Sequence, residues 1–199
     1  MALRFIVGTF ALALAFFLAG CGGGTTPAGE PAPAAAAPAS APAPGAGQAS
    51  VLGDLLKDWQ NQKDTLMKIA DAMPENKFGY KSTPAQRTYG EQVMHVALVN
   101  VDLLKVIKGA ATPPSFTAES AKTKADILKA LDESYDYGAA LLKEQTDATI
   151  TGTIDASFLG PSTRARVFWT LLAHSMDIYG QMAVYLRLNG IVPPASRGV

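Results

Sequence analysis

The composition of residues 22–50 limits where this chain can build a folded domain. The segment consists of Gly, Ala, Pro, Ser and Thr apart from Glu30 and Gln48. Because proline removes a helical hydrogen bond and large apolar side chains are missing, such a segment forms neither a lasting helix nor a core. We therefore expect residues 21–50 to be a disordered Ala/Pro/Gly-rich linker, semi-extended at about 3.1 Å per residue where it is polyproline-like. The folded domain is then confined to residues 51–199.

Four stretches of this domain carry apolar side chains at the spacing of an α-helix. Pro74 ends the first stretch, and Thr88 and Glu91 form a capping box at the start of the second. Residues 148–160, rich in Thr, Ile and Gly, are expected to be a loop or a short extended excursion. The expected helices are about Val51–Met73, Thr88–Lys108, Glu119–Thr146 and, after a cap at Ser162 or Thr163, the residues up to Gly190. Four helices of about this length predict an all-α fold, an antiparallel four-helix bundle.

Residues 1–20 have the pattern of a secretory signal peptide. Arg4 lies near the start, and the apolar run Phe5–Leu18 that follows is shorter than the roughly 20 residues of a membrane-spanning helix. The next residues, Leu18-Ala19-Gly20-Cys21, resemble the lipobox of bacterial lipoproteins, in which the cysteine is lipidated and becomes the mature N-terminus. The alternative is an uncleaved membrane anchor with an incidental cysteine. We expect a signal peptide and a lipidated Cys21.

The lipobox also predicts where the protein resides. Acyl chains on Cys21 would anchor the chain to a membrane, since each buried methylene contributes roughly 0.8 kcal/mol. The following residue is Gly22 and not the Asp that retains some lipoproteins at the inner membrane, which favours the outer membrane. We expect a cell-envelope protein that faces the periplasm and has the membrane as its partner through the N-terminal lipid.

The charge balance and the cysteine content exclude some classes of function. The chain has 17 basic and 17 acidic residues and a formal net charge of zero, so no electrostatic attraction to nucleic acid is expected. One cysteine allows no intrachain disulfide and no Cys-rich metal site. The two histidines, His95 and His174, are the only imidazoles that could bind a metal.

Each of these histidines lies in a polar stripe on an otherwise apolar helix. His95 and Asp102 share one face of the second expected helix, and His174 and Gln181 share one face of the fourth. Because a buried polar group costs free energy unless it is paired, the two stripes are expected to face each other, a cavity or water. The alternative is that each histidine is an ordinary hydrogen-bonded core or surface residue.

Two blocks of sequence resemble the DinB-like proteins. The first block contains Met73-Pro74-Glu75, Tyr80-Lys81-Ser82-Thr83-Pro84, Arg87-Thr88-Tyr89-Gly90-Glu91 and His95, and the second runs from His174 to Gln181 and from Tyr185 to Pro194. The resemblance covers residues 51–196. It implies a four-helix bundle, often a homodimer, in which many members bind a divalent metal through one histidine of the second helix and two histidines of the fourth. Relatives with known activity include S-transferases and isomerases that act with low-molecular-weight thiols.

Carried over residue by residue, the resemblance implies an incomplete metal site. His95 matches the first ligand and His174 the second, whereas the third position holds Ile178, which cannot bind a metal. Asp177 lies beside it and offers a carboxylate on nearly the same side of the helix. Two imidazoles and one carboxylate suit zinc, nickel, iron or manganese, so the expected cofactor is one such divalent metal or none.

Three functions are compatible with these patterns. We favour a DinB-like envelope lipoprotein with an incomplete or altered divalent-metal site, whose specific activity the sequence leaves unassigned. The alternatives are a metal-dependent transferase or hydrolase that uses His95, His174 and Asp177, and a non-catalytic bundle that binds a small ligand or a protein. Export weakens the thiol-transferase reading, because small thiol cofactors are chiefly cytosolic. A homodimer formed through the bundle is compatible with all three.

Overall fold

The computed structural model describes residues 49–198. The expected signal peptide, Cys21 and all but the last two residues of the expected linker lie outside the described residues. The described residues belong to one compact unit and share one hydrophobic core, which is the anatomy of a domain that can fold by itself. Within residues 49–198 no helix has the length and apolar character needed to cross a membrane.

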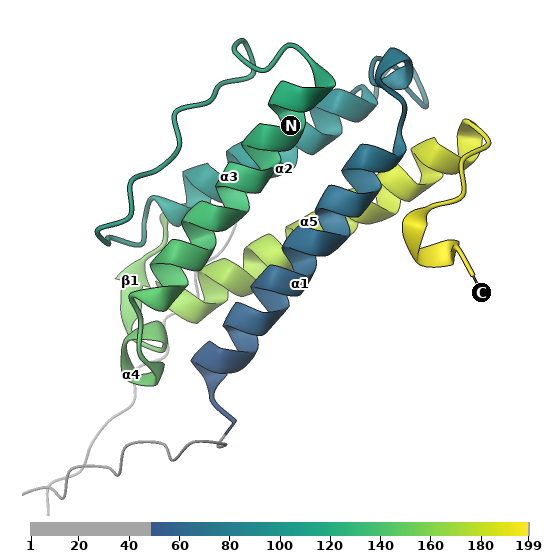
Figure 1. Ribbon diagram of the computed structural model, residues 1–199. Helices are drawn as coiled ribbons and strands as arrows, with labels where there is room; N and C mark the ends of the chain where they lie inside the picture. The colour runs from purple at the N-terminus through teal and green to yellow at the C-terminus, as the bar shows by residue number, and fades with distance from the viewer. Residues whose placement is uncertain (1–48, 199) are drawn as a thin grey trace, which may run out of the picture. The chain divides into compact units, whose positions relative to one another are not determined.

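Four long helices make up the domain (Figure 1). They are α1 (Val51–Ala72), α2 (Tyr89–Leu104), α3 (Lys124–Lys143) and α5 (Arg164–Leu188). These confirm the four helices expected from the apolar spacing, with ends that differ by up to five residues. Hydroxyl caps set the starts, because the side chains of Ser50, Thr88, Thr123 and Thr163 each accept a backbone N–H of the first turn. Ser50 is therefore part of the domain and not of the linker.

The connections carry short elements: η1 (Glu75–Lys77), α4 (Asp147–Ile150), β1 (Thr153–Asp155), η2 (Ser157–Leu159), β2 (Pro161–Thr163) and η3 (Pro194–Ser196). β1 and β2 pair antiparallel, with Ile154 opposite Ser162. The segment expected to be a loop or a short extended excursion is thus a helical turn followed by one strand of a small hairpin. Its second strand leads directly into α5, and Thr163 is the cap of that helix.

α2 and α3 are neighbours that run in the same direction, so the expected antiparallel bundle is only partly right. Near the start of both helices Gly90 lies against Ile127, and further along both Asn100 donates a hydrogen bond to Ser134 at 3.2 Å. The connection of residues 105–123 runs back along the bundle (Figure 1). An extended chain covers about 3.3 Å per residue against 1.5 Å in a helix, so this connection is long enough for that return.

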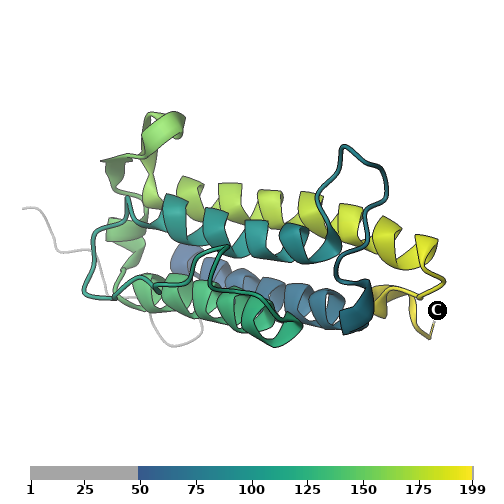
Figure 2. The same ribbon diagram turned by 90° about the horizontal axis from the view of Figure 1, so that it is seen from above.

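The other neighbours form two layers, α1 with α3 and α2 with α5 (Figure 2). In the first layer the helices are antiparallel, because Trp59 packs on Tyr135 while Lys124 pairs with Asp71 at 2.8 Å. α5 lies antiparallel to α2, with the hydroxyl of Tyr185 near the start of α2. This arrangement places the middle of α2 against the middle of α5.

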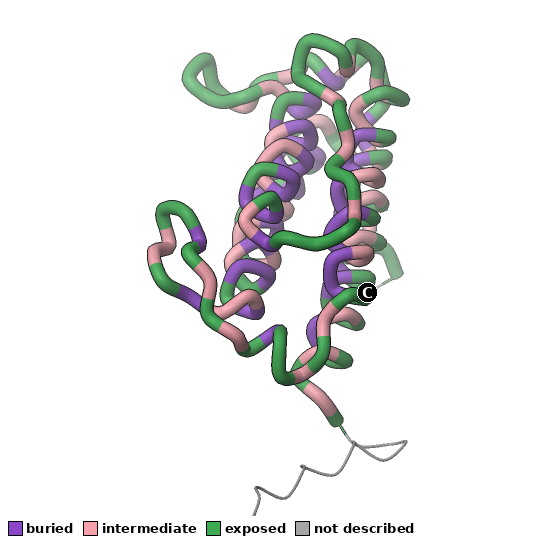
Figure 3. Tube along the Cα trace, turned by 90° about the vertical axis from the view of Figure 1, so that its left-hand side faces the viewer, coloured by how far each residue is buried: buried purple, intermediate pink, exposed green. Residues whose placement is uncertain are grey.

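The inner faces of the helices are buried along their length (Figure 3). Trp59 is fully buried, donates its indole N–H to the carbonyl of Tyr135 at 2.8 Å, and packs edge-on against Phe168. Gly138 makes room for this indole, since a Cβ there would lie 2.4 Å from the Trp59 ring. The core is therefore tightly fitted around one aromatic cluster that joins α1, α3 and α5.

Candidate functional site

The two histidines meet between α2 and α5. The Nε2 atoms of His95 and His174 are 3.2 Å apart, and the two rings are tilted by 70° with centroids 5.0 Å apart. One ring nitrogen can donate its proton to the other, so the pair forms a single imidazole–imidazole hydrogen bond. The structure thus brings together the two residues that the sequence singled out, and we call them the imidazole pair.

Burial favours the neutral form of both imidazoles. Burial lowers the pKa of His95 below its ordinary value of 6.5, and the charges of Arg87 and His174 lower it further. Burial also lowers the pKa of His174, against a smaller raising effect of Asp177. Neutral imidazoles keep a lone pair on one ring nitrogen, which is the form that binds a metal or accepts a hydrogen bond.

Asp177 belongs to a chain of hydrogen bonds beside the imidazole pair. Its carboxylate accepts a hydrogen bond from Gln181 Nε2 at 3.0 Å, and Gln181 Oε1 accepts one from Gln92 Nε2 at 2.8 Å. Asp177 itself is exposed, whereas Gln92 is fully buried and its Oε1 has no hydrogen-bond partner among the described residues. These hydrogen bonds link α5 to α2 about one turn of α2 before the imidazole pair.

Ile178 lies one helical turn after His174 and is only 3% exposed. It is part of the hydrophobic core. The position that the resemblance assigns to a third histidine is therefore occupied by a packed apolar side chain.

The residues fit part of a metal centre and not the three-imidazole centre implied by the resemblance. Two nitrogens 3.2 Å apart can both reach one ion at the usual Zn–N distance of about 2.0–2.1 Å. However, residues 49–198 contain no group of three or more His, Cys, Asp or Glu side chains that could hold a metal ion. In addition, Nδ1 of His174 is buried without a partner, although the second nitrogen of a metal-bound histidine almost always donates to an acceptor.

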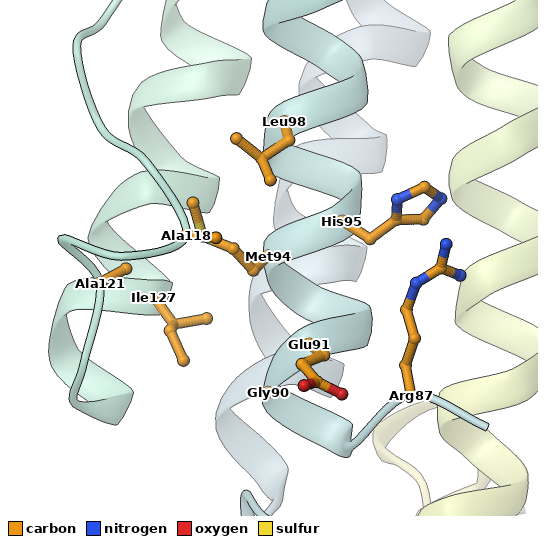
Figure 4. Close-up of a pocket in the computed structure, with 9 residues that line it drawn as sticks. All are labelled: Arg87, Gly90, Glu91, Met94, His95, Leu98, Ala118, Ala121 and Ile127. Carbon is orange, nitrogen blue, oxygen red and sulfur yellow. The ribbon is translucent and has the colours of Figure 1, made fainter. Parts of the chain in front are cut away.

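Arg87 and His95 also line an open cavity of about 420 Å³ (Figure 4). We call it the α2 cavity, and its lining residues are Arg87, Gly90, Glu91, Met94, His95, Leu98, Ala118, Ala121 and Ile127. Sequence reasoning missed both Arg87 and Gln92. Arg87 stands in the first block of the resemblance, directly before the helix cap Thr88, which was a signal that it could matter. Gln92 lies in an apolar stretch that gave no signal.

Both the sequence and the fold are similar to those of DinB-like proteins. The model of the DinB superfamily matches residues 58–182, and no curated protein matches the chain. The fold is similar to the crystal structure of a DinB-like protein from Bacillus cereus, with a TM-score of 0.59 at 20% identity over 71% of this chain and 95% of that one. A DinB-like protein from Bacillus subtilis gives a TM-score of 0.55 at 16% identity over 69% and 92%. The chain belongs to the DinB superfamily.

Proposed function

We propose that this protein is a cell-envelope lipoprotein whose divalent-metal site is altered to two imidazoles that hold a cation weakly. The observation that carries the proposal is the 3.2 Å approach of His95 and His174, with Ile178 buried at the position of a third ligand. A metal ion bound there would act as a Lewis acid toward a thiol or a water. The envelope location is proposed from the lipobox at Cys21.

Two features argue for weak binding. Structural zinc sites with four ligands contribute about 10–16 kcal/mol, so half that ligand set scales to roughly 5–8 kcal/mol and a Kd of about 1 µM or weaker. The positive charge of Arg87 also reaches both imidazoles, because it lowers the pKa of each. The same positive potential disfavours a divalent cation.

Calorimetric titration of zinc and nickel into a chain that begins at Ala49 tests this proposal. We expect a Kd of about 1 µM or weaker, and no binding above background in His95→Ala or His174→Ala. Metal analysis of the protein as purified should find less than one equivalent. Nanomolar binding by the wild type would contradict the proposal.

A metal-dependent transferase or hydrolase is the second candidate, with Asp177 as the third ligand. It is favoured by the influence of the Asp177 carboxylate on the pKa of His174 and by the Gln181 amide that holds this carboxylate. In that case the wild type binds metal tightly and Asp177→Ala abolishes binding. Asp102→Ala is the matched control, since its exposed carboxylate pairs with Lys105. Equal affinity in both variants would refute a ligand role for Asp177.

A further inference from the structure

The α2 cavity has one apolar side and one polar side. Met94, Leu98 and Ile127 form the apolar wall together with two alanines of the connection that returns to α3. Figure 4 shows these side chains gathered on the α3 side of α2, while Arg87 and His95 lie on the side that faces α5. A ligand that fills the cavity would therefore contact apolar atoms along its body and polar groups at one end.

The polar end carries one positive charge, on Arg87, and one negative charge, on Glu91. The five salt bridges among the described residues leave Arg87 out, and the guanidinium extends toward the His95 ring (Figure 4). Glu91 also lines the cavity, but one of its carboxylate oxygens is already committed to the Thr88 N–H at 2.6 Å. The start of α2 adds the positive end of a helix dipole at the same place.

Arg87 is held in position by its backbone. Its carbonyl accepts a hydrogen bond from the hydroxyl of Tyr185 at 2.7 Å, and Tyr185 is only 2% exposed. The next residue, Thr88, is the cap of α2. The backbone at Arg87 is therefore fixed by these contacts. Its guanidinium has five N–H donors in a planar fork, which suits a carboxylate.

The volume sets the size of the ligand. At a water molecule's share of roughly 30 Å³ per non-hydrogen atom, about 420 Å³ accommodates on the order of a dozen such atoms. The volume also lies within the range of about 300–1,000 Å³ that is usual for small-molecule sites.

We propose that the α2 cavity binds a small amphipathic carboxylate, with its apolar body against Met94, Leu98 and Ile127 and its carboxylate on Arg87. The imidazole of His95 lines the same polar end of the cavity. The inference goes beyond the proposed function and does not require a metal on the imidazole pair.

Octanoate and its neutral counterpart octanamide are the probes. Both are titrated calorimetrically, in the presence of a chelator, into the chain that begins at Ala49 and into three variants. Arg87→Gln removes the guanidinium, Ala121→Phe fills the cavity from the connection 105–123, and Arg197→Gln removes an exposed guanidinium outside it. We expect octanoate to bind at least about ten-fold more tightly than octanamide, as the loss of one charge-assisted hydrogen bond implies.

The variants separate the contributions of charge and shape. Arg87→Gln should reduce octanoate affinity about ten-fold or more and leave octanamide unchanged, Ala121→Phe should weaken both, and Arg197→Gln should change neither. Thermal melts of the variants verify that each is folded. Absence of octanoate binding, equal binding of both probes by the wild type, or an unchanged octanoate affinity in Arg87→Gln would overturn the inference. Because a chelator is present, these results are independent of the metal titrations, so either proposal can fail alone.

Discussion

Replacing Ile178 by histidine should convert the imidazole pair into a three-ligand metal centre. Ile178 lies one turn after His174 on α5, and His174 meets His95 at 3.2 Å. A histidine at i+4 covers the same face of the helix as the residue at i. The variant therefore adds a third imidazole beside the two that are already present.

The expected gain in metal affinity is large and its cost in stability is moderate. Loss of an outer partner of a metal ligand alone changes affinity by about 10–100-fold, so a new ligand should raise zinc affinity by at least about 100-fold. Ile178 is 3% exposed, and losing its burial costs about 1.5–3 kcal/mol. Zinc at about 100 times its Kd returns roughly 2.7 kcal/mol. The variant should thus melt below the wild type without metal and close to it with zinc.

The assay is calorimetric titration of zinc and nickel together with thermal unfolding, each with and without metal. Val184→His is the matched control, because Val184 is half exposed on the outer face of α5 and adds an imidazole away from the pair. If Ile178→His binds zinc no more tightly than Val184→His does, a side chain at position 178 does not reach the two histidines. The proposal that this site is an altered three-histidine metal site then fails.

The remaining predictions concern anchoring, folding and pH. Cys21→Ser should leave an unlipidated precursor with its signal attached, and mass spectrometry that finds an unmodified cysteine in the native protein would contradict the lipoprotein assignment. Deleting residues 22–48 should leave the melting temperature unchanged, whereas a chain that also lacks Ser50 should lose about 1 kcal/mol with its helix cap. Gly138→Ala should destabilise the domain by about 1–3 kcal/mol through overpacking against the buried indole, while Gly180→Ala, where a Cβ meets open space, should stabilise it by about 0.5–1 kcal/mol; urea titration measures both. Because the pKa of each imidazole of the pair is lowered by burial from 6.5, the unfolded state takes up protons first as the pH falls, so the free energy of unfolding should decline below about pH 6.5. A variant with both imidazoles replaced by glutamine should lose this part of the pH dependence, and an unchanged profile would mean that the pair is not responsible.

The helices could be predicted from the sequence because their signals are local. Apolar spacing and the Thr88 cap place α2, and Pro74 limits α1, without any knowledge of the neighbouring helices. The direction of α3 relative to α2 could not be predicted in the same way. It depends on the path of the connection 105–123, which runs back along the bundle and which no local pattern encodes.

The candidate site, too, has features that could be predicted from the sequence and features that could not. The meeting of His95 and His174 was open to prediction, because each lies in a polar stripe and buried polar groups require partners. The contact between Gln92 and Gln181 depends on the register of α2 against α5, which no local pattern encodes. Arg87 belongs to the block that resembles the DinB-like proteins, but only the return of the chain between α2 and α3 makes it the polar end of a cavity.

An isoleucine in place of a histidine at position 178 affects the stability of the bundle as well as its capacity to bind metal. A three-imidazole centre places polar groups between helices, and these groups cost free energy unless an ion or hydrogen bonds satisfy them. The packed Ile178 side chain, 3% exposed, instead contributes about 1.5–3 kcal/mol of apolar burial that needs no ion. The two imidazoles share one hydrogen bond between their Nε2 atoms, while Nδ1 of His174 stays without a partner among the described residues. We therefore expect the domain to fold without bound metal.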